Sequence, residues 1–334
     1  MTLSSNDLVT GGAPHGAAAH GLPAAGSTAA VPAADPAHAT PGAAARPAAA
    51  DDAAAQSLLA ACEARTERRV VTVAGRRLAW RRIGRGRPLV LVHGGHGNWM
   101  HWVRNLDALA ATRTVWLPDL AGYGNSELPA GEPTLDGLVA ATGAALDALV
   151  GADTAVDIAG FSFGGLVAAH LAAARWQRDP ASVGRLALLG TAGHGGPRRN
   201  DLSGLVNWRR HPAGPERDAD LRHNLGELML SRGAQTDALA LAVHRAACTA
   251  TRFRSAALAA QPLLQPALAR LGAPVLFLWG ESDAVGIPSV TGPELVAGRP
   301  ERRWEALPDA GHWVQYEQAE EVNRRLEDWF GGVA

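Results

Sequence analysis

The sequence Gly-Phe-Ser-Phe-Gly-Gly at residues 160–165 constrains the fold of this chain more than any other stretch. It follows a largely apolar run at residues 155–159, which predicts a buried strand, and precedes a second run at residues 166–171, which predicts a buried helix. A Gly-x-Ser-x-Gly turn between a strand and a helix is typical of a tight bend that holds its central residue in a strained conformation. Glycines are expected beside that residue because side chains there would collide.

Such a turn would expose Ser162 at the start of a helix, where unpaired N–H groups and partial positive charge favour a developing oxyanion. Ser162 is therefore a candidate nucleophile, and the N–H of Phe163 is a candidate oxyanion donor. The alternative is a glycine-rich turn with an idle serine, because a short motif is a hypothesis until its context agrees.

The beginning of the chain differs in composition from the rest. Residues 1–62 are dominated by Ala, Pro and Gly and are expected to form a disordered tail, because they bury too little apolar surface to offset their ordering entropy. They lack the basic start and Leu-rich core of a signal peptide. Residues 51–65 could form a short helix that leads into one α/β domain with an insertion.

Charge and cysteine content restrict the partners. The net charge of −1 gives no electrostatic reason to expect nucleic acid or an anionic membrane, and no apolar run is long enough to span a bilayer. Cys62 and Cys248 have neither metal-ligand spacing nor an obvious disulfide framework, so a reduced, cytoplasmic location is the default expectation. The expected partner is a small-molecule substrate, and a homo-oligomer stays open.

Strand-like and helix-like runs alternate along most of the remaining chain. Strands are expected at residues 67–73 and 76–83, joined as a hairpin, and then at 88–92, 113–117, 155–159, 185–189, 274–279 and 302–306, with helices at 102–110, 134–150 and 317–330. This alternation predicts an α/β fold with a mostly parallel sheet that helices cover on both faces. The core would comprise residues 63–191 and 269–334, with residues 192–268 as an inserted helical lid.

A nucleophilic serine needs an adjacent base, and the base needs an orienting acid. In parallel sheets these groups gather beyond the carboxyl ends of the strands. Asp283 follows the expected strand at 274–279, and His312 follows the strand at 302–306. The sequence therefore predicts a site made of Ser162, His312 and Asp283, with Glu281 as the alternative acid.

The loop after the strand at residues 88–92 is the expected source of a second oxyanion donor. It reads His-Gly-Gly-His-Gly at residues 93–97, and its glycines would let the backbone approach a ligand closely. Gly95 is assigned as this donor, with Gly94 and His96 as alternatives. Gly94 is also a candidate substrate contact, and His93 is expected to brace the loop by hydrogen bonds.

Other side chains were weighed for binding roles. His93, His96 and His101 lie close in the sequence, but matching acid or thiolate ligands are missing, so neither a metal nor another cofactor is expected. Trp99 and Trp313 could line a substrate pocket, as could Trp102 and Trp208, whereas Trp80, Trp116 and Trp329 are expected in the core. Arg252 and Arg254 could recognise a substrate carboxylate, although solvated surface is the more usual place for such residues.

Several motifs together make the chain similar to the α/β-hydrolase superfamily over most of residues 65–334. They are His93-Gly94-Gly95, the segment Asp119–Ser126, the serine turn, Trp279–Asp283 and Gly311-His312. The resemblance implies the α/β-hydrolase fold, the order Ser, Asp, His for the catalytic groups, and a structural role for Asp119. The haloalkane dehalogenase and epoxide hydrolase branches use Asp where this chain has Ser162.

The segment Gly311–Glu317 is also similar to the carbon–carbon hydrolases that cleave ring-fission products of aromatic degradation. Those enzymes usually carry Asn immediately before the nucleophile, where this chain has Phe161. The expected function is a cofactor-independent serine hydrolase that cleaves a carboxylic ester of a small, mostly apolar substrate through an acyl-enzyme. The alternatives are carbon–carbon hydrolysis, acyl transfer, and a non-catalytic ligand-binding protein on the same fold.

Overall fold

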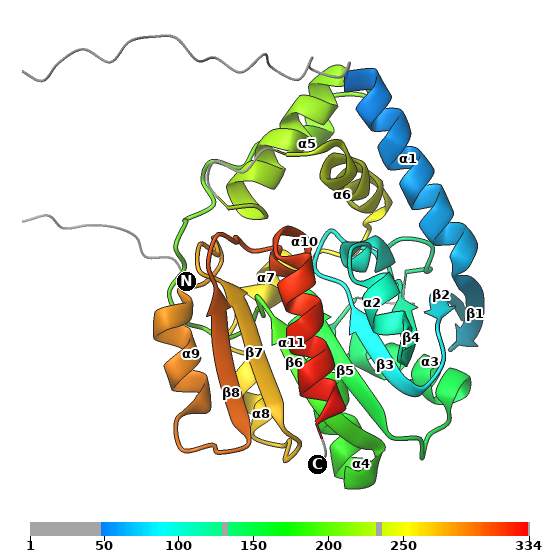
Figure 1. Cartoon of the computed structure of the whole chain (residues 1–334), viewed down its shortest axis with the longest axis vertical. Coiled ribbons are helices and arrows are strands. Elements are labelled where there is room, and N and C mark those ends of the chain that lie inside the picture. The colour runs from blue at the N-terminus through cyan, green and yellow to red at the C-terminus, as the bar shows by residue number, and fades with distance from the viewer. Residues whose placement is uncertain (1–47, 129–132, 232–235, 333–334) are drawn as a thin grey trace, which may run out of the picture. The chain divides into compact units, whose positions relative to one another are not determined.

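A computed structural model describes residues 48–128, 133–231 and 236–332 of the chain. In these segments an eight-stranded sheet runs in the order β1-β2-β4-β3-β5-β6-β7-β8, with helices in front of it and behind it (Figure 1). β1 (Glu67–Val73) and β2 (Arg76–Ile83) form an antiparallel hairpin, β2 pairs antiparallel with β4, and every other pairing is parallel. The predicted α/β fold with a mostly parallel sheet is confirmed.

The remaining elements follow in chain order. The strands are β3 (Arg87–Val92), β4 (Arg113–Pro118), β5 (Val156–Phe161), β6 (Val183–Leu189), β7 (Val275–Gly280) and β8 (Arg302–Leu307). The helices are α1 (Ala48–Arg65), η1 (Trp99–Trp102), α2 (Leu106–Ala110), α3 (Leu135–Val150), α4 (Phe163–Arg178), η2 (Pro180–Ser182), η3 (Trp208–Arg210), α5 (Pro215–Leu228), α6 (Ala238–Ala250), α7 (Ala256–Ala259), α8 (Leu264–Leu268), α9 (Pro288–Val296), α10 (Val314–Glu317) and α11 (Ala319–Gly331). The single helix expected over residues 102–110 is wrong, because η1 ends at Trp102 and α2 begins only at Leu106.

The two faces of the sheet build two apolar cores. On β3, Val90 and Val92 belong to the first core and Leu89 and Leu91 to the second, and all four side chains are completely buried. Residues of α3, α4 and α8 complete the first core, and residues of α2 and α11 complete the second. A strand covered on both faces has no polar side, which explains why β3 reads as an unbroken apolar run. The predicted core positions of Trp80, Trp116 and Trp329 are confirmed.

The helices between β6 and β7 divide into two groups. α5 and α6 lie above the sheet, beyond the end at which β8 leads into α10 (Figure 1). α8 instead packs against α4, and its residues Leu264 and Leu268 join the core behind the sheet. α5 and α6, with the segment that precedes them, are therefore positioned to cover the carboxyl ends of the strands.

The first described helix corrects the expected extent of the disordered tail. Residues 48–62 were expected within that tail, but they form most of α1, which packs against α6. Ala55, Leu59 and Cys62 are buried along one side of α1, although its overall composition is rich in Ala. The rest of the expected tail, residues 1–47, lies outside the described residues.

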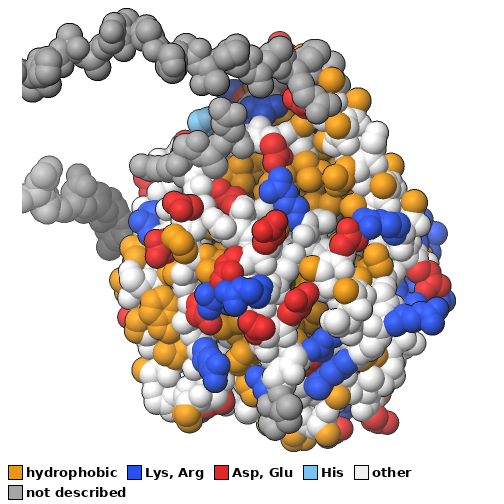
Figure 2. Space-filling view, viewed as in Figure 1, with side chains coloured by type: hydrophobic (Ala, Val, Ile, Leu, Met, Phe, Trp, Pro, Cys, Tyr) orange, Lys and Arg blue, Asp and Glu red, His pale blue; other side chains and the backbone are white. Residues whose placement is uncertain are grey.

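The visible surface carries no area of a single charge. Acidic and basic side chains alternate on the face shown in Figure 2, over the helix α11. On that helix Arg324 pairs with Glu321 and Asp328, and Arg325 pairs with Glu321. Among the helices of the three described segments, none is long and apolar enough to cross a membrane.

Candidate active site

The serine turn has the strained geometry that its sequence predicts. Ser162 lies between β5 and α4 with φ 54° and ψ −122°, a conformation that side chains seldom adopt. A Cβ atom added to Gly160 would lie 2.4 Å from the Gly164 carbonyl oxygen, and one added to Gly164 would lie 2.1 Å from the His93 oxygen. Both glycines are therefore required by the close approach of backbone, and the turn holds Ser162 at the carboxyl end of the sheet.

The structure brings Ser162, His312 and Asp283 together. His312 Nε2 is 2.8 Å from Ser162 Oγ, and His312 Nδ1 is 2.9 Å from both carboxylate oxygens of Asp283. The ionised carboxylate only accepts, so Nδ1 carries the proton and Nε2 accepts from the serine hydroxyl. His312 is 2% exposed and Asp283 is fully buried, which keeps these hydrogen bonds away from competing water.

Asp283, rather than Glu281, is the acid that reaches His312. The side chain of Glu281 is exposed, whereas the Asp283 carboxylate also accepts a hydrogen bond from the Val285 N–H at 2.7 Å. Gly190, with φ 49°, passes close by, and a Cβ atom there would lie 3.1 Å from Asp283 Oδ2 and His312 Nδ1. Because Gly190 at the end of β6 has no side chain, Asp283 after β7 and His312 after β8 can lie next to it.

His93 fixes the loop that contains Gly94 and Gly95. The Leu120 N–H donates to His93 Nε2 at 3.0 Å, so the other ring nitrogen, Nδ1, donates to the Gly94 carbonyl oxygen at 2.8 Å. Complete burial lowers the pKa of His93 to about 4, so this ring is neutral at pH 7. The C=O and N–H of one trans peptide point in opposite directions, so the hydrogen bond to Gly94 O sets the direction of the Gly95 N–H.

His101 fixes the same loop through the N–H of Gly94. The Gly94 N–H donates to His101 Nδ1 at 3.2 Å, which leaves Gly94 engaged and favours Gly95 among the three alternative donors. Burial and the neighbouring histidines hold the pKa of His101 well below its usual value. The His101 carbonyl oxygen also accepts from Trp313 Nε1 at 3.0 Å, so this histidine joins the glycine loop to the residue after His312.

Phe163 and Ser255 complete the surroundings of Gly95. Phe163 is the first residue of α4, a position whose N–H has no intrahelical acceptor. A Cβ atom added to Gly95 would lie 3.6 Å from Phe163 Cβ and 2.7 Å from Ser255 Oγ. The two backbone segments that were predicted to supply oxyanion donors therefore meet beside Ser162.

Comparison with known proteins agrees with this geometry. A family model described as "Alpha/beta hydrolase family" matches residues 89–325. The chain belongs to the alpha/beta hydrolase family of enzymes.

Two curated relatives in this family show how far the similarity extends. The chain is 35% identical over 265 residues to the dihydrolipoyllysine-residue acetyltransferase component of the acetoin cleaving system of Pseudomonas putida. That match covers 76% of this chain but only 66% of the relative, so a third of the relative lies outside it. The chain is also 30% identical over 264 residues to 2-hydroxy-6-oxo-6-phenylhexa-2,4-dienoate hydrolase of Burkholderia cepacia, a match that covers 74% of this chain and 88% of the relative.

Solved structures of other alpha/beta hydrolases share the fold. The meta-cleavage product hydrolase of Pseudomonas fluorescens superposes with a TM-score of 0.64 at 23% identity, covering 79% of this chain and 97% of that one. The carboxylesterase CesB of Bacillus subtilis superposes with a TM-score of 0.65 at 18% identity, covering 85% of this chain and 100% of that one. At these identities the superpositions support the common fold only. The reaction has to be inferred from the residues of the site.

A cavity of about 210 Å³ in this alpha/beta hydrolase begins at Gly95. Its wall combines apolar side chains with two asparagines and an arginine on the side formed by α5 and the segment before it, and carries imidazole and thiol groups on the side of α6. It is lined by Gly95, His96, Leu205, Val206, Asn207, Trp208, Arg209, Asn224, Leu228, Met229, His244 and Cys248. This volume suits a small acyl or alcohol group next to the proposed oxyanion donors.

The tryptophans expected beside a substrate lie elsewhere, with one exception. Trp208 lines the cavity, as predicted. Trp99 is 2% exposed and lies beneath the guanidinium of Arg81, and Trp313 is completely buried and stacks on Tyr316. Neither indole lines this cavity, because both pack in the second core, and their contact with substrate stays a prediction.

The arginines and the remaining polar residues are placed as follows. Arg252 donates to the Ser126 carbonyl oxygen and Arg254 is exposed, whereas Arg209 lines the cavity and stacks over Trp208 at 4.2 Å. Asp119 accepts from the N–H groups of Trp99 at 3.0 Å and Asn125 at 2.9 Å, in agreement with its expected structural role. Across the described segments, no group of three His, Cys, Asp or Glu residues is arranged to hold a metal ion.

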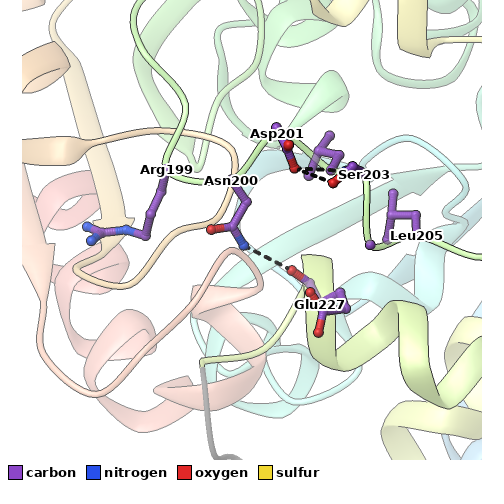
Figure 3. Close-up of a pocket in the computed structure, with 8 residues that line it drawn as sticks. Arg199, Asn200, Asp201, Ser203, Leu205 and Glu227 are labelled. Carbon is purple, nitrogen blue, oxygen red and sulfur yellow. Dashed lines mark hydrogen bonds between the residues drawn. The ribbon is translucent and has the colours of Figure 1, made fainter.

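A second, larger cavity of about 490 Å³ lies away from Ser162, between the segment after β6 and α5. Figure 3 shows Arg199 directed away from Glu227 toward the loop after β7, and Asn200 directed toward Glu227. Arg199 donates to the backbone oxygens of Asp283 at 3.2 Å and Glu281 at 2.6 Å. Ser162, Asp283 and His312 do not line this cavity, and Arg199 ties the segment after β6 to the loop that carries Asp283.

The sequence did not reveal the supporting functions of His101, Arg199 and Ser255. His101 was considered only as a metal ligand, and its contact with Trp313 spans 212 residues of sequence. Arg199 reaches a loop 84 residues away, and Ser255 approaches Gly95 only because the chain returns from α6 to the site. No local pattern marks such residues, because their partners are chosen by tertiary packing.

Proposed function

We propose that this alpha/beta hydrolase cleaves a carboxylic ester of a small, mostly apolar substrate, with Ser162 as the nucleophile. The observation that carries the proposal is the hydrogen-bonded series Ser162–His312–Asp283 beside the N–H groups of Phe163 and Gly95. A serine becomes a useful nucleophile at neutral pH when an imidazole accepts its proton and a carboxylate stabilises the resulting cation.

Acylation would proceed in two steps. Ser162 Oγ attacks the ester carbonyl carbon while its proton moves to His312 Nε2, and Asp283 stabilises the imidazolium. The oxyanion of the tetrahedral intermediate accepts hydrogen bonds from the Phe163 and Gly95 N–H groups, which are fixed before substrate arrives. His312 then donates its proton to the departing alcohol oxygen as the carbon–oxygen bond breaks, which leaves the acyl group on Ser162.

Deacylation would repeat these steps with water. His312 takes a proton from the water molecule as its oxygen attacks the acyl carbon, and the second tetrahedral intermediate uses the same two N–H groups. Return of the proton from His312 to Ser162 Oγ releases the carboxylic acid and restores the site. Every step uses the chain's own groups and water.

We also propose that the insertion at residues 192–268 acts as a lid, chiefly through α5 and α6. Leu228 and Met229, at the end of α5, line the cavity that begins at Gly95, so movement of α5 would open it. A closed lid excludes bulk water and strengthens the hydrogen bonds of the site. The core would then comprise residues 63–191 and 269–334, and the free, buried thiols of Cys62 and Cys248 favour a cytoplasmic location.

The test combines covalent labelling with turnover of p-nitrophenyl esters of graded acyl length. A fluorophosphonate should label the folded protein and the Ser203→Ala control, in which an exposed serine is removed, but not Ser162→Ala. Ser162→Ala should lower kcat at least about a hundredfold while leaving the unfolding temperature nearly unchanged. A smaller loss of turnover would contradict the mechanism, and absence of labelling would favour a non-catalytic binding protein.

Carbon–carbon hydrolysis is the second candidate, because relatives at 30% identity are named as hydrolases of 2-hydroxy-6-oxodienoates and 2-hydroxymuconate semialdehyde. Ser162 and His312 could act on the carbonyl carbon of a ketone in the same way as on that of an ester. A vinylogous 1,5-diketone assayed beside the esters separates the two reactions. Turnover of the diketone alone would replace ester cleavage as the proposal. Transfer of the acyl group to an added alcohol or amine would instead favour acyl transfer, the activity named in the Pseudomonas putida relative.

A further inference from the structure

The polar side of the cavity beside Gly95 is not used by the proposed ester mechanism. His244 lies on α6, is 7% exposed and lines this cavity. The His244 ring contacts the thiol of Cys248 as its hydrogen-bond partner. Cys248 Sγ lies 3.5 Å from Nε2 and 3.7 Å from Nδ1. A thiol is a weak partner and can satisfy one of the two nitrogens at a time, so a buried imidazole retains unused hydrogen-bonding capacity here.

Both groups are uncharged at neutral pH. Burial lowers the pKa of His244 to about 4 and raises the pKa of the Cys248 thiol to about 12. Cys248 therefore does not compete with Ser162 as a nucleophile. A neutral imidazole can donate one hydrogen bond to a hydroxyl or ketone oxygen, but it brings no positive charge to compensate a buried carboxylate.

The polar pair is also close to the proposed reaction centre. Cys248 Sγ lies 4.0 Å from the carbonyl oxygen of His96, the residue after Gly95. Across the cavity, Leu205, Val206, Leu228 and Met229 present apolar side chains, and the Asn224 amide is engaged with both backbone groups of Val206. A substrate that fills this space therefore meets mostly apolar groups, with Asn207 and Arg209, on one side and the under-used imidazole of His244 on the other.

We propose that His244 binds an uncharged oxygen substituent, a hydroxyl or a ketone, on the part of the substrate that enters the cavity. This inference rests on the proposed function and narrows its substrate class to esters of hydroxy or oxo acids. An alternative source of selectivity is Arg209, which lines the same cavity and would favour a carboxylate. The experiment distinguishes the two.

Three p-nitrophenyl esters of similar shape provide the comparison: pentanoate, 4-oxopentanoate and hemisuccinate, with spontaneous hydrolysis measured on Ser162→Ala. The wild-type chain should prefer 4-oxopentanoate to pentanoate by about 3- to 10-fold in kcat/KM, the range expected for one hydrogen bond. His244→Leu should reduce this ratio to about one, and His244→Gln should restore part of it because the amide can still donate and accept. Thr249→Ala, an exposed change on the same helix, should leave the ratio and the rates unchanged.

Two outcomes would overturn the inference while leaving ester cleavage intact. The first is an equal rate on pentanoate and 4-oxopentanoate, or a preference that His244→Leu and His244→Gln both retain. The second is a preference for the hemisuccinate that Arg209→Leu abolishes.

If none of the esters is turned over, the proposed function fails, and ligand binding still decides the inference. Thermal shifts of Ser162→Ala with 4-oxopentanamide and pentanamide then measure recognition directly. A larger shift with the oxo compound that His244→Leu removes supports the subsite, and equal shifts contradict it.

Discussion

The backbone N–H of Gly94 donates to the imidazole of His101 at 3.2 Å, and the carbonyl oxygen of Gly94 accepts a hydrogen bond from His93 at 2.8 Å. Both rings are buried, and the pKa of each is lowered by loss of water, so both remain neutral and keep a lone pair for a backbone N–H. Gly94 is thus held at both of its backbone polar groups. The direction of the Gly95 N–H is set before substrate binds, which is the condition for strong oxyanion stabilisation.

Substitution of His93 tests whether this orientation matters. The side-chain amide of Asn can take the place of Nδ1, whereas that of Gln reaches the position of Nε2. We expect His93→Asn to retain kcat within about 10-fold, and His93→Gln to lose about 10- to 100-fold, somewhat less than removal of an oxyanion donor. KM should change little in either variant, because the loop acts on the transition state.

Steady-state kinetics and thermal unfolding of both variants check this prediction. The unfolding temperatures serve as the control, since a variant that merely unfolds loses active protein without changing the kcat of the remainder. Equal kcat values in the Asn and Gln variants would show that the hydrogen bond to Gly94 O does not orient the donor.

Two glycine-to-alanine substitutions test the packing of the serine turn. A Cβ atom at Gly164 would lie 2.1 Å from the His93 oxygen, whereas a Cβ atom at Gly226 in α5 meets nothing within 4 Å. We expect Gly164→Ala to lower the free energy of unfolding by about 3 kcal/mol or more, and Gly226→Ala to raise it by about 0.5–1 kcal/mol through helix propensity. Urea unfolding measures both, and a mild effect at Gly164 would mean that the backbone around Ser162 can move apart.

The triad could be predicted because each of its members is marked locally. Ser162 lies in a turn that only glycines permit, and Asp283 and His312 each follow a recognisable strand. In a parallel sheet all the carboxyl ends of the strands lie at one edge, so residues that directly follow different strands are close together in space. The fold and the meeting of these three side chains therefore follow from patterns of fewer than ten residues each.

The docking of helix α1 and the cavity beside Gly95 could not be predicted in the same way. Trp313 follows His312 directly, yet it is buried because its indole N–H finds the His101 oxygen, 212 residues earlier in the chain. The apolar positions of α1 are mostly alanines with Leu59 among them, so its sequence gives little sign of a buried side. In both cases the decisive partner is remote in sequence, and periodicity carries no information about it.

Acid should destabilise the folded chain well above the pH at which carboxylates titrate. The pKa of His93 and the pKa of His244 are each lowered by burial to about 4, against a usual value of 6.5. Between about pH 4 and pH 6.5 these histidines bind protons in the unfolded state but not in the folded state. The free energy of unfolding therefore falls as the pH decreases from about 6.5 to about 4. Each histidine should contribute a loss of about 3 kcal/mol over this window.

Chemical unfolding at several pH values between 4.5 and 8 measures this slope. His244→Leu should show a smaller loss between pH 7 and pH 4.5 than the wild-type chain, because one of the contributing histidines is absent. Burial raises the pKa of Asp119, a contribution of the opposite sign that reduces the slope without reversing it. A stability that stays constant from pH 7 to pH 4.5 would contradict the neutral, buried state of these histidines.

Adjacent leucines in α1 allow a matched test of whether this helix is docked. Leu59 is 8% exposed and packs in the core that includes residues of α6, whereas Leu58 is 46% exposed. We expect Leu59→Ala to lower the free energy of unfolding by about 2–3 kcal/mol and Leu58→Ala to change it by less than about 0.5 kcal/mol. Because α1 packs against α6, which carries His244, Leu59→Ala should also raise KM more than it lowers kcat. Urea unfolding and ester kinetics of the two variants check both statements, and equal stabilities would mean that α1 does not pack on the domain in solution.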